Sequence, residues 1–78
     1  MKTTRYFEEE RPVKHPEVSR EQAAWVAQHF EHQRVQSCGR IRRWAFVEEL
    51  DHYVRVILLS DGETLHNAFV DSNPEPLR

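Results

Sequence analysis

The chain has 78 residues, a formal net charge of −2 at pH 7, and 38% hydrophobic and 31% charged residues. This length allows a single domain with a thin core, and the apolar content excludes an intrinsically disordered chain. The slightly acidic balance excludes a protein that attracts nucleic acid through its net charge. However, the stretch from Gln33 to Ala45 carries four arginines and no acid. The sequence therefore predicts a local basic surface on an acidic protein.

Two prolines break any long element within residues 1–18, which leaves an irregular segment or a short helix there. Ser19 and Gln22 form a capping-box pattern, so a helix is predicted from residue 19 to residue 32. Its apolar residues recur at three- and four-residue spacing. This spacing forms an apolar stripe, which is typical of a helix that packs on a sheet.

The rest of the chain is predicted to form a sheet over residues 34–71. The runs RIRRWAFVEE, YVRVILLS and TLHNAFV indicate three antiparallel strands, and a short strand before Gly39 adds an edge. Asp61-Gly62 predicts a two-residue hairpin turn, and Leu50-Asp51 is expected to link the preceding strands. Residues 72–78 are expected to run irregularly over the surface, with little part in function.

The predicted fold class is α+β, in one domain of residues 1–78. One main N-terminal helix, with room for a second short one, packs on a three- to four-stranded antiparallel sheet. Cys38 is the only cysteine, which excludes an internal disulfide and fits a reducing compartment. No signal peptide or bilayer-spanning run is present, so we expect a cytoplasmic protein with no membrane partner. No CxxC or HExxH spacing occurs, so we predict neither a metal site nor a cofactor.

The expected turns assign strand residues to two faces, because directly opposed residues share a face. The face expected to meet the helix holds Ile41, Ala45, Val47, Val54, Val56, Leu58, Leu65 and Phe69. The other face is expected to hold Arg42, Trp44, Phe46, Glu48, Tyr53, Arg55, Ile57, Leu59, Thr64, His66 and Ala68. A three-residue loop near Leu50 would exchange Arg42 for Arg43 on this second face, so both arginines are candidates.

The second face has the residue types of a phosphate-binding surface. Guanidinium groups make bidentate contacts to phosphate oxygens, and aromatic rings stack on bases. In a metal-free phosphodiester cleavage, arginines stabilise the developing charge while a histidine or tyrosine transfers protons. The candidate catalytic residues are His66, Arg55 and Tyr53. The candidate RNA- or phosphate-binding residues are Arg42, Arg43, Trp44 and Arg55.

The same pattern also fits a half-exposed sheet face with ordinary cross-strand pairs of arginines, carboxylates and aromatic rings. Arg55 interrupts the most apolar strand, where an unpaired buried charge is costly. It therefore either meets a carboxylate such as Glu48 or lines a cleft. The sequence does not decide whether the protein is an enzyme.

The segments GRIRRW at 39–44, YVRV at 53–56 and DGETLHNAFVD at 61–71 resemble a group of short bacterial proteins that end in this pattern. More distantly, the order of elements and the strand arginines are similar to the RelE and BrnT kind of toxin fold. The RelE-like resemblance implies N-terminal helices on a small antiparallel sheet. It also implies a metal-independent ribonuclease or ribosome-associated toxin whose partners are RNA and a small acidic protein.

The rival hypothesis is a binding or structural protein without chemistry. Apolar residues of the second face would then be covered in a homodimer, which stabilises a domain of this size. These residues are Trp44, Phe46, Ile57 and Leu59.

Overall fold

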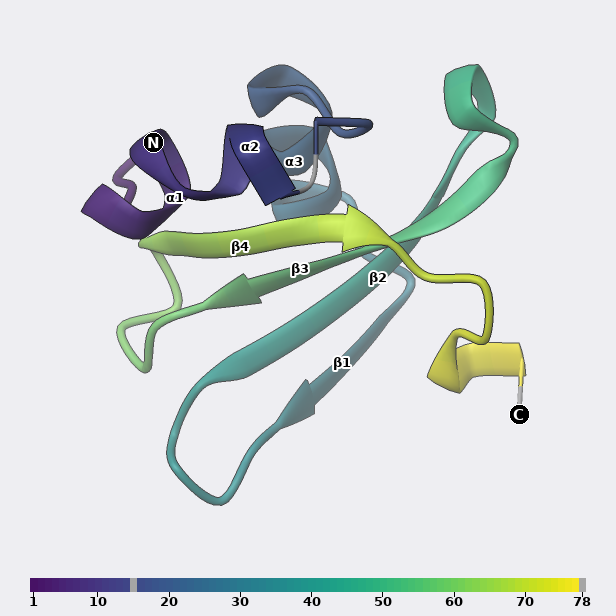
Figure 1. Cartoon of the computed structure of the whole chain (residues 1–78). Coiled ribbons are helices and arrows are strands. Elements are labelled where there is room, and N and C mark those ends of the chain that lie inside the picture. The colour runs from purple at the N-terminus through teal and green to yellow at the C-terminus, as the bar shows by residue number, and fades with distance from the viewer. Residues whose placement is uncertain (15, 78) are drawn as a thin grey trace.

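A computed structural model describes residues 1–14 and 16–77 of the chain. Three short helices precede a four-stranded antiparallel sheet with the strand order β1-β2-β3-β4. The elements are α1 (Arg5–Glu9), α2 (Arg11–Lys14), α3 (Arg20–Gln28), β1 (His32–Val35), β2 (Ile41–Val47), β3 (His52–Leu58) and β4 (Leu65–Val70), with 3-10 turns at Glu48–Leu50 and Glu75–Leu77. The helices lie together on one side of the sheet (Figure 1). The α+β class and the antiparallel sheet are as predicted, whereas several short helices stand where one main helix was expected.

Helix α3 begins as its sequence indicates and ends earlier. Ser19 accepts a hydrogen bond from the Gln22 amide while the Gln22 side chain accepts one from the Ser19 amide, so the predicted capping box is confirmed. The predicted end at residue 32 is wrong, because the helix stops at Gln28 and His32 already pairs with Trp44 in the sheet. Cross-strand pairing outweighs the weak helix propensity of these residues.

The N-terminal segment covers the outer edge of β4. Thr3 forms a parallel bridge with Leu65, whose amide donates to the Lys2 carbonyl at 2.8 Å. The Thr4 side chain then accepts from the Phe7 amide and caps α1. Because an open strand edge is a site of unwanted pairing, this segment protects the end of β4.

The register of β2 against β3 keeps the predicted faces, although the turn differs. Val47 lies opposite His52 and Ala45 lies opposite Val54, which is two residues from the expected pairing. The loop is longer than predicted because a 3-10 turn, Glu48–Leu50, is followed by Asp51 in the left-handed region at φ 53°. A shift of two residues preserves which side chains share a face, since the side-chain period of a strand is two.

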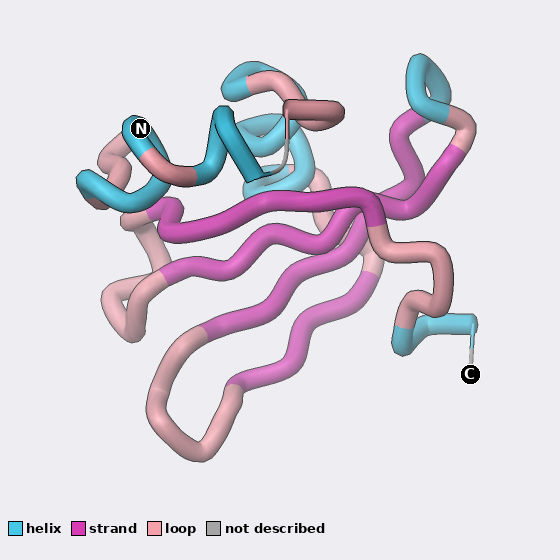
Figure 2. The backbone as a smooth tube through the Cα atoms, viewed as in Figure 1, coloured by secondary structure: helices cyan, strands magenta, loops and turns pink. Residues whose placement is uncertain are grey.

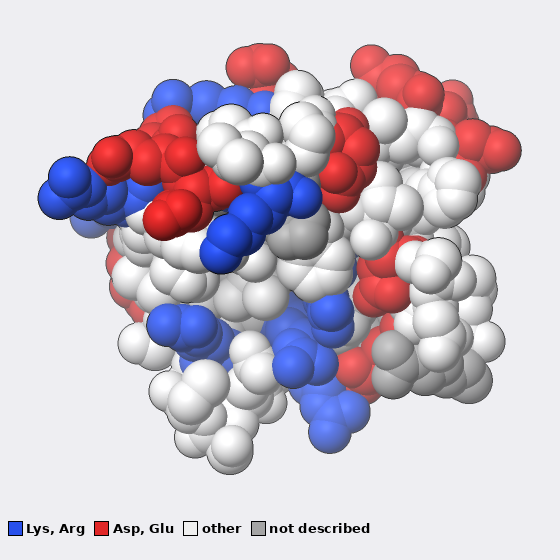
Figure 3. Space-filling view, viewed as in Figure 1, with Lys and Arg blue, Asp and Glu red and all other residues white. Residues whose placement is uncertain are grey.

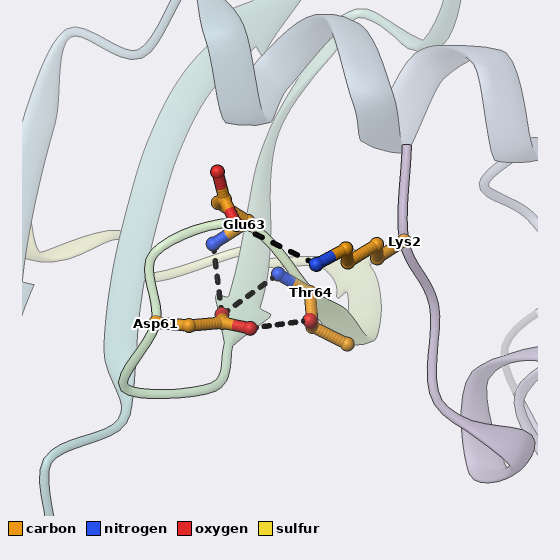
Figure 4. Close-up of polar contacts among 4 residues, drawn as sticks. All are labelled: Lys2, Asp61, Glu63 and Thr64. Carbon is orange, nitrogen blue, oxygen red and sulfur yellow. Dashed lines mark hydrogen bonds and ion pairs between the residues drawn. The ribbon is translucent and has the colours of Figure 1, made fainter.

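The β3–β4 connection is also longer than the predicted two-residue turn. Leu59 donates to the Thr64 carbonyl at 2.9 Å, and Gly62 alone in the loop takes a positive φ, 70°. The Asp61 carboxylate accepts hydrogen bonds from the Glu63 amide, the Thr64 amide and the Thr64 hydroxyl (Figure 4). These three bonds lower the pKa of Asp61 to about 2.

A β-bulge in β4 overturns part of the predicted face assignment. Leu58 pairs with Leu65, but Ile57 pairs with Asn67, so His66 is the additional residue. After His66, each residue of β4 therefore lies on the opposite face of the sheet from the one predicted. Ala68 is therefore buried in the core, and Phe69 lies opposite Arg55 on the other face.

The core lies between the helices and one face of the sheet. Its fully or nearly fully buried residues are Phe7, Val18, Ala23, Val26, Ala27, Ala45, Val47, Val54, Val56, Leu58, Leu65 and Ala68. Except for Phe69, the residues predicted for this face belong to the core or pack against it. No helix within residues 1–14 and 16–77 is long and apolar enough to cross a membrane.

The C-terminal segment is more ordered than the predicted irregular tail. The tube in Figure 2 leaves β4, runs down past the end of the sheet and ends in the 3-10 turn Glu75–Leu77. Pro74 is buried, and Asp71 accepts a hydrogen bond from Trp44 Nε1 at 2.9 Å. This segment therefore covers one end of the sheet on the side away from the helices.

Candidate functional site

The face of the sheet away from the helices, which we call the open face, carries arginines and aromatic rings. By register it consists of His32 and Arg34 from β1, Arg42, Trp44 and Phe46 from β2, Tyr53, Arg55 and Ile57 from β3, and Asn67 and Phe69 from β4. In the view of Figure 3, basic side chains gather over the lower part of the sheet, below the helices. The predicted basic surface on an acidic protein is thus present.

Arg55 is partly buried at the centre of the open face. Its Nε lies 3.8 Å from the Asp71 carboxylate, and its guanidinium carbon lies 4.5 Å from the centre of the Phe69 ring. The carboxylate is not Glu48, as the sequence suggested, but one from the C-terminal segment. Arg55 is therefore a charge-balanced, packed arginine that holds this segment on the sheet.

Trp44 is fully buried, with 0% of its surface exposed. The indole packs beneath the C-terminal segment, with His32 tilted against it at 5.4 Å and Asp71 bonded to its nitrogen. A base has no access to this ring, so the predicted stacking role of Trp44 does not fit the structure.

Arg43 points to the helices rather than to the open face. Its Nη1 donates to the Ala27 carbonyl at 2.7 Å, in the last turn of α3, and its guanidinium lies 4.4 Å from the Phe30 ring. Burial lowers the pKa of Arg43. The register thus decides between the two arginine candidates, because Arg42 shares the face of Arg55 and Arg43 does not.

Three arginines, Arg34, Arg40 and Arg42, form what we call the basic end, where the 36–40 loop joins β1 to β2. Arg34 and Arg42 are directly opposed across the two strands. Like charges at such positions repel each other, so an anion between them is favoured. Glu75 already supplies one carboxylate, which accepts from Arg34 Nη1 at 2.7 Å beside a hollow of about 400 Å³.

His66 lies at the bulge of β4, where its ring is held from two directions. Its Nδ1 is 3.0 Å from the Thr4 hydroxyl, and the ring stacks on Tyr6 with a centroid distance of 4.9 Å. Nε2 has no hydrogen-bond partner among the described residues. When Nδ1 donates to Thr4, Nε2 presents the lone pair of a general base; in the other tautomer it carries the proton of a general acid.

The environment of His66 favours the neutral ring. Partial burial lowers the pKa of His66 below its usual value of 6.5, and the positive charge of Arg40 lowers it further. Arg40 directly precedes β2 and is exposed. The structure thus couples His66 to the basic end through Arg40.

Tyr53 is tied to a different part of the sheet. Its hydroxyl donates to Glu31 at 3.0 Å, and this hydrogen bond raises the pKa of Tyr53. The bulge at Ile57 lies four residues along β3, roughly 13 Å away at about 3.3 Å per residue. The predicted grouping of Tyr53 with His66 in one site is therefore not found, since the two side chains lie at opposite ends of the sheet.

Thr4 and Tyr6 were not identified from the sequence, although both contact His66. Thr4 is 62 residues away from His66 along the chain, and no local pattern links them. Arg40 was identified in the sequence as part of the arginine-rich stretch, but its electrostatic effect on His66 could not be predicted, because the position of His66 depends on the bulge. No cluster of three metal-binding side chains occurs among the described residues.

Comparison of the chain with protein-family models, with curated proteins and with solved structures finds no match. The resemblance to RelE-like proteins therefore stays a prediction, and the site is interpreted from its own geometry.

Proposed function

We propose that the protein binds single-stranded RNA at the basic end and cleaves it without a metal, with His66 as the proton-transfer residue. The observation that carries this proposal is the placement of His66, anchored at Nδ1 by Thr4, unpartnered at Nε2 within the described chain, and electrostatically coupled to Arg40. A neutral imidazole whose pKa is lowered by burial and by the charge of a guanidinium is suited to accept a proton near an anionic phosphate.

The proposed chemistry assigns a role to each of these residues. Nε2 of His66 removes the proton of an RNA 2′-hydroxyl, and the 2′-oxygen forms a bond to the adjacent phosphorus. The bond to the 5′-oxygen breaks, and that oxygen takes a proton from water, which leaves a 2′,3′-cyclic phosphate and a 5′-hydroxyl end. Arg40 and Arg42 stabilise the charge that develops on the phosphoryl oxygens.

The test is cleavage of a fluorescent single-stranded RNA oligonucleotide in buffer containing a chelator. We expect His66→Asn to lower the cleavage rate by about 10²- to 10⁴-fold, as for loss of a general base. His52→Asn is the matched control, because His52 is exposed at the far end of β3 and its ring hydrogen-bonds to the Leu50 carbonyl. Equal rates for wild-type protein and His66→Asn would contradict the catalytic role.

A second candidate is an RNA- or protein-binding module without chemistry. It is favoured by the internal carboxylate partners of Arg34 and Arg55, since paired arginines are typical of structural sheet faces. The same assay separates the candidates. Binding that depends on Arg40 and Arg42, with no cleavage by wild-type protein, would support the module, and Arg5→Gln is the control for charge.

A further inference from the structure

A groove of about 600 Å³ lies at the end of β2 opposite the basic end. It is lined by Trp25, Glu31, Phe46, Val47, Glu48 and Glu49. A smaller hollow of about 370 Å³ continues it on the other side of Trp25, and this hollow is lined also by Ser19, Glu21 and Gln22. The two hollows share Trp25 and Glu49, so the indole forms a ridge between them.

The lining of both hollows contains four glutamates and no lysine or arginine. In Figure 3 acidic side chains gather at the upper right, over the loop that joins β2 to β3. The charge of this end is therefore opposite to that of the basic end. Such a surface repels phosphate and attracts a cation.

Trp25 is exposed on α3, and its side chain is not part of the hydrophobic core. Nearly half of its surface, 46%, is accessible, although its neighbours Val26 and Ala27 are buried in the core. One face of the indole stacks on His29 at 4.9 Å. An exposed indole beside carboxylates is a favourable place for a lysine or arginine side chain, because cation–π and ionic attraction add there.

Glu31 is fixed in this groove by hydrogen bonds. One carboxylate oxygen accepts from the Tyr53 hydroxyl and the other from the Phe46 amide, both at 3.0 Å. The raised pKa of Tyr53 keeps its hydroxyl a donor. The negative charge of Glu31 is thus held in place before any ligand arrives, which reduces the ordering cost of binding.

We propose that this groove binds a lysine- or arginine-bearing extended peptide segment of a partner protein. One cationic side chain lies on Trp25 next to Glu49, and neighbouring apolar residues of the peptide contact Phe46. The charge of the groove excludes RNA as its occupant, so this site is separate from the basic end and does not depend on the proposed RNA chemistry.

The test uses a short synthetic peptide in which lysine and arginine alternate with glycine and leucine, titrated into the full chain at low ionic strength. Binding is measured by isothermal titration calorimetry. We expect Glu48→Gln/Glu49→Gln, and separately Trp25→Ala, to weaken binding by about tenfold, as for loss of charge pairs or a cation–π contact. The matched control is Glu9→Gln/Glu10→Gln, which removes two adjacent exposed acids at the end of α1.

The proposal would be overturned by the absence of any heat of binding, by equal weakening in the two double variants, or by equal affinity for a peptide with glutamate in place of lysine and arginine. A circular dichroism spectrum identical to that of wild type shows that each variant is folded. Self-association of the chain detected by sizing, with no affinity for the peptide, would assign the groove to a second copy and would also overturn the proposal.

Discussion

The arginines show how the position of one residue type in the fold determines what its charge does. Arg11 is 5% exposed, donates to the Val18 carbonyl at 2.6 Å and lies over the Phe7 ring, so it stabilises the packing of the N-terminal helices. Arg43 donates to the Ala27 carbonyl and so stabilises the packing of the end of α3 on the sheet. Arg40 is exposed at the start of β2 and influences His66 through space. Of these three arginines, Arg40 is the one whose guanidinium is available to a ligand.

The lowered pKa of His66 predicts a pH dependence of stability. The unfolded chain titrates near ~6.5, and the folded chain titrates lower, so the unfolded state binds more protons within this window. Stability therefore falls as the pH falls through ~6.5 toward the lowered value. We expect urea unfolding between about pH 7 and pH 5 to show a smaller loss of stability in His66→Asn than in wild-type protein. An equal loss in both proteins would contradict the partly buried, neutral state of the ring.

For single residues, contacts that depend on short sequence spacing were predicted correctly, and contacts between residues distant in the sequence were not. Ser19 and Gln22 lie three positions apart, and their capping box was predicted correctly. The partners of His66, Thr4 and Tyr6, come from the other end of the chain, and His66 itself lies at a bulge that no turn signal marks. Sequence reasoning therefore found His66 as a candidate but assigned it the wrong neighbours.

Among the elements, the C-terminal segment has the most direct consequence for the site. Its Asp71 and Glu75 carboxylates contact arginines of the open face, in positions that phosphate groups of a ligand would also favour. The Arg34 guanidinium lowers the pKa of Glu75, so this carboxylate is charged at neutral pH. Under the proposed function, the segment competes with the phosphate groups of RNA at the basic end.

We expect Glu75→Gln to raise the affinity for a single-stranded RNA oligonucleotide by about two- to fivefold at low ionic strength, because an exposed ion pair contributes little and one acid is removed. Fluorescence anisotropy measures the change. Glu10→Gln, which removes the exposed acid that follows α1, is the control for net charge and should have a smaller effect. An unchanged or weaker affinity for Glu75→Gln would show that Arg34 takes no part in RNA binding.

The strands were predictable from the alternation of apolar and polar residues. The assignment of strand residues to the two faces of the sheet was correct up to the bulge in β4. The core positions of β2 and β3 followed from the side-chain period, which a register shift of two residues does not alter. The bulge after Leu65 reversed the rest of β4, because the two successive polar residues His66 and Asn67 had been interpreted as part of a regular alternation. The early end of α3 was missed because pairing with β2 depends on contacts distant in the sequence.

Across the whole molecule, charge is divided between the two ends of β2. Arg34, Arg40 and Arg42 lie at one end, while the groove beside Trp25 is acidic at the other. The net charge of −2 hides this division. This division of charge is compatible with both proposals, an RNA site at one end and a basic-peptide site at the other, since each surface acts over about a Debye length of ~8–10 Å in physiological salt.

Backbone NMR of the labelled protein, titrated with a single-stranded RNA oligonucleotide at low ionic strength, tests the central claim most directly. The account predicts that amide signals of the 36–42 segment and of His66 and Asn67 shift together, while those of the Glu48–Leu50 turn and of Tyr53 stay in place. Shifts confined to the Glu48–Leu50 turn and the surroundings of Trp25, or no shifts at any RNA concentration, would contradict an RNA site at the basic end.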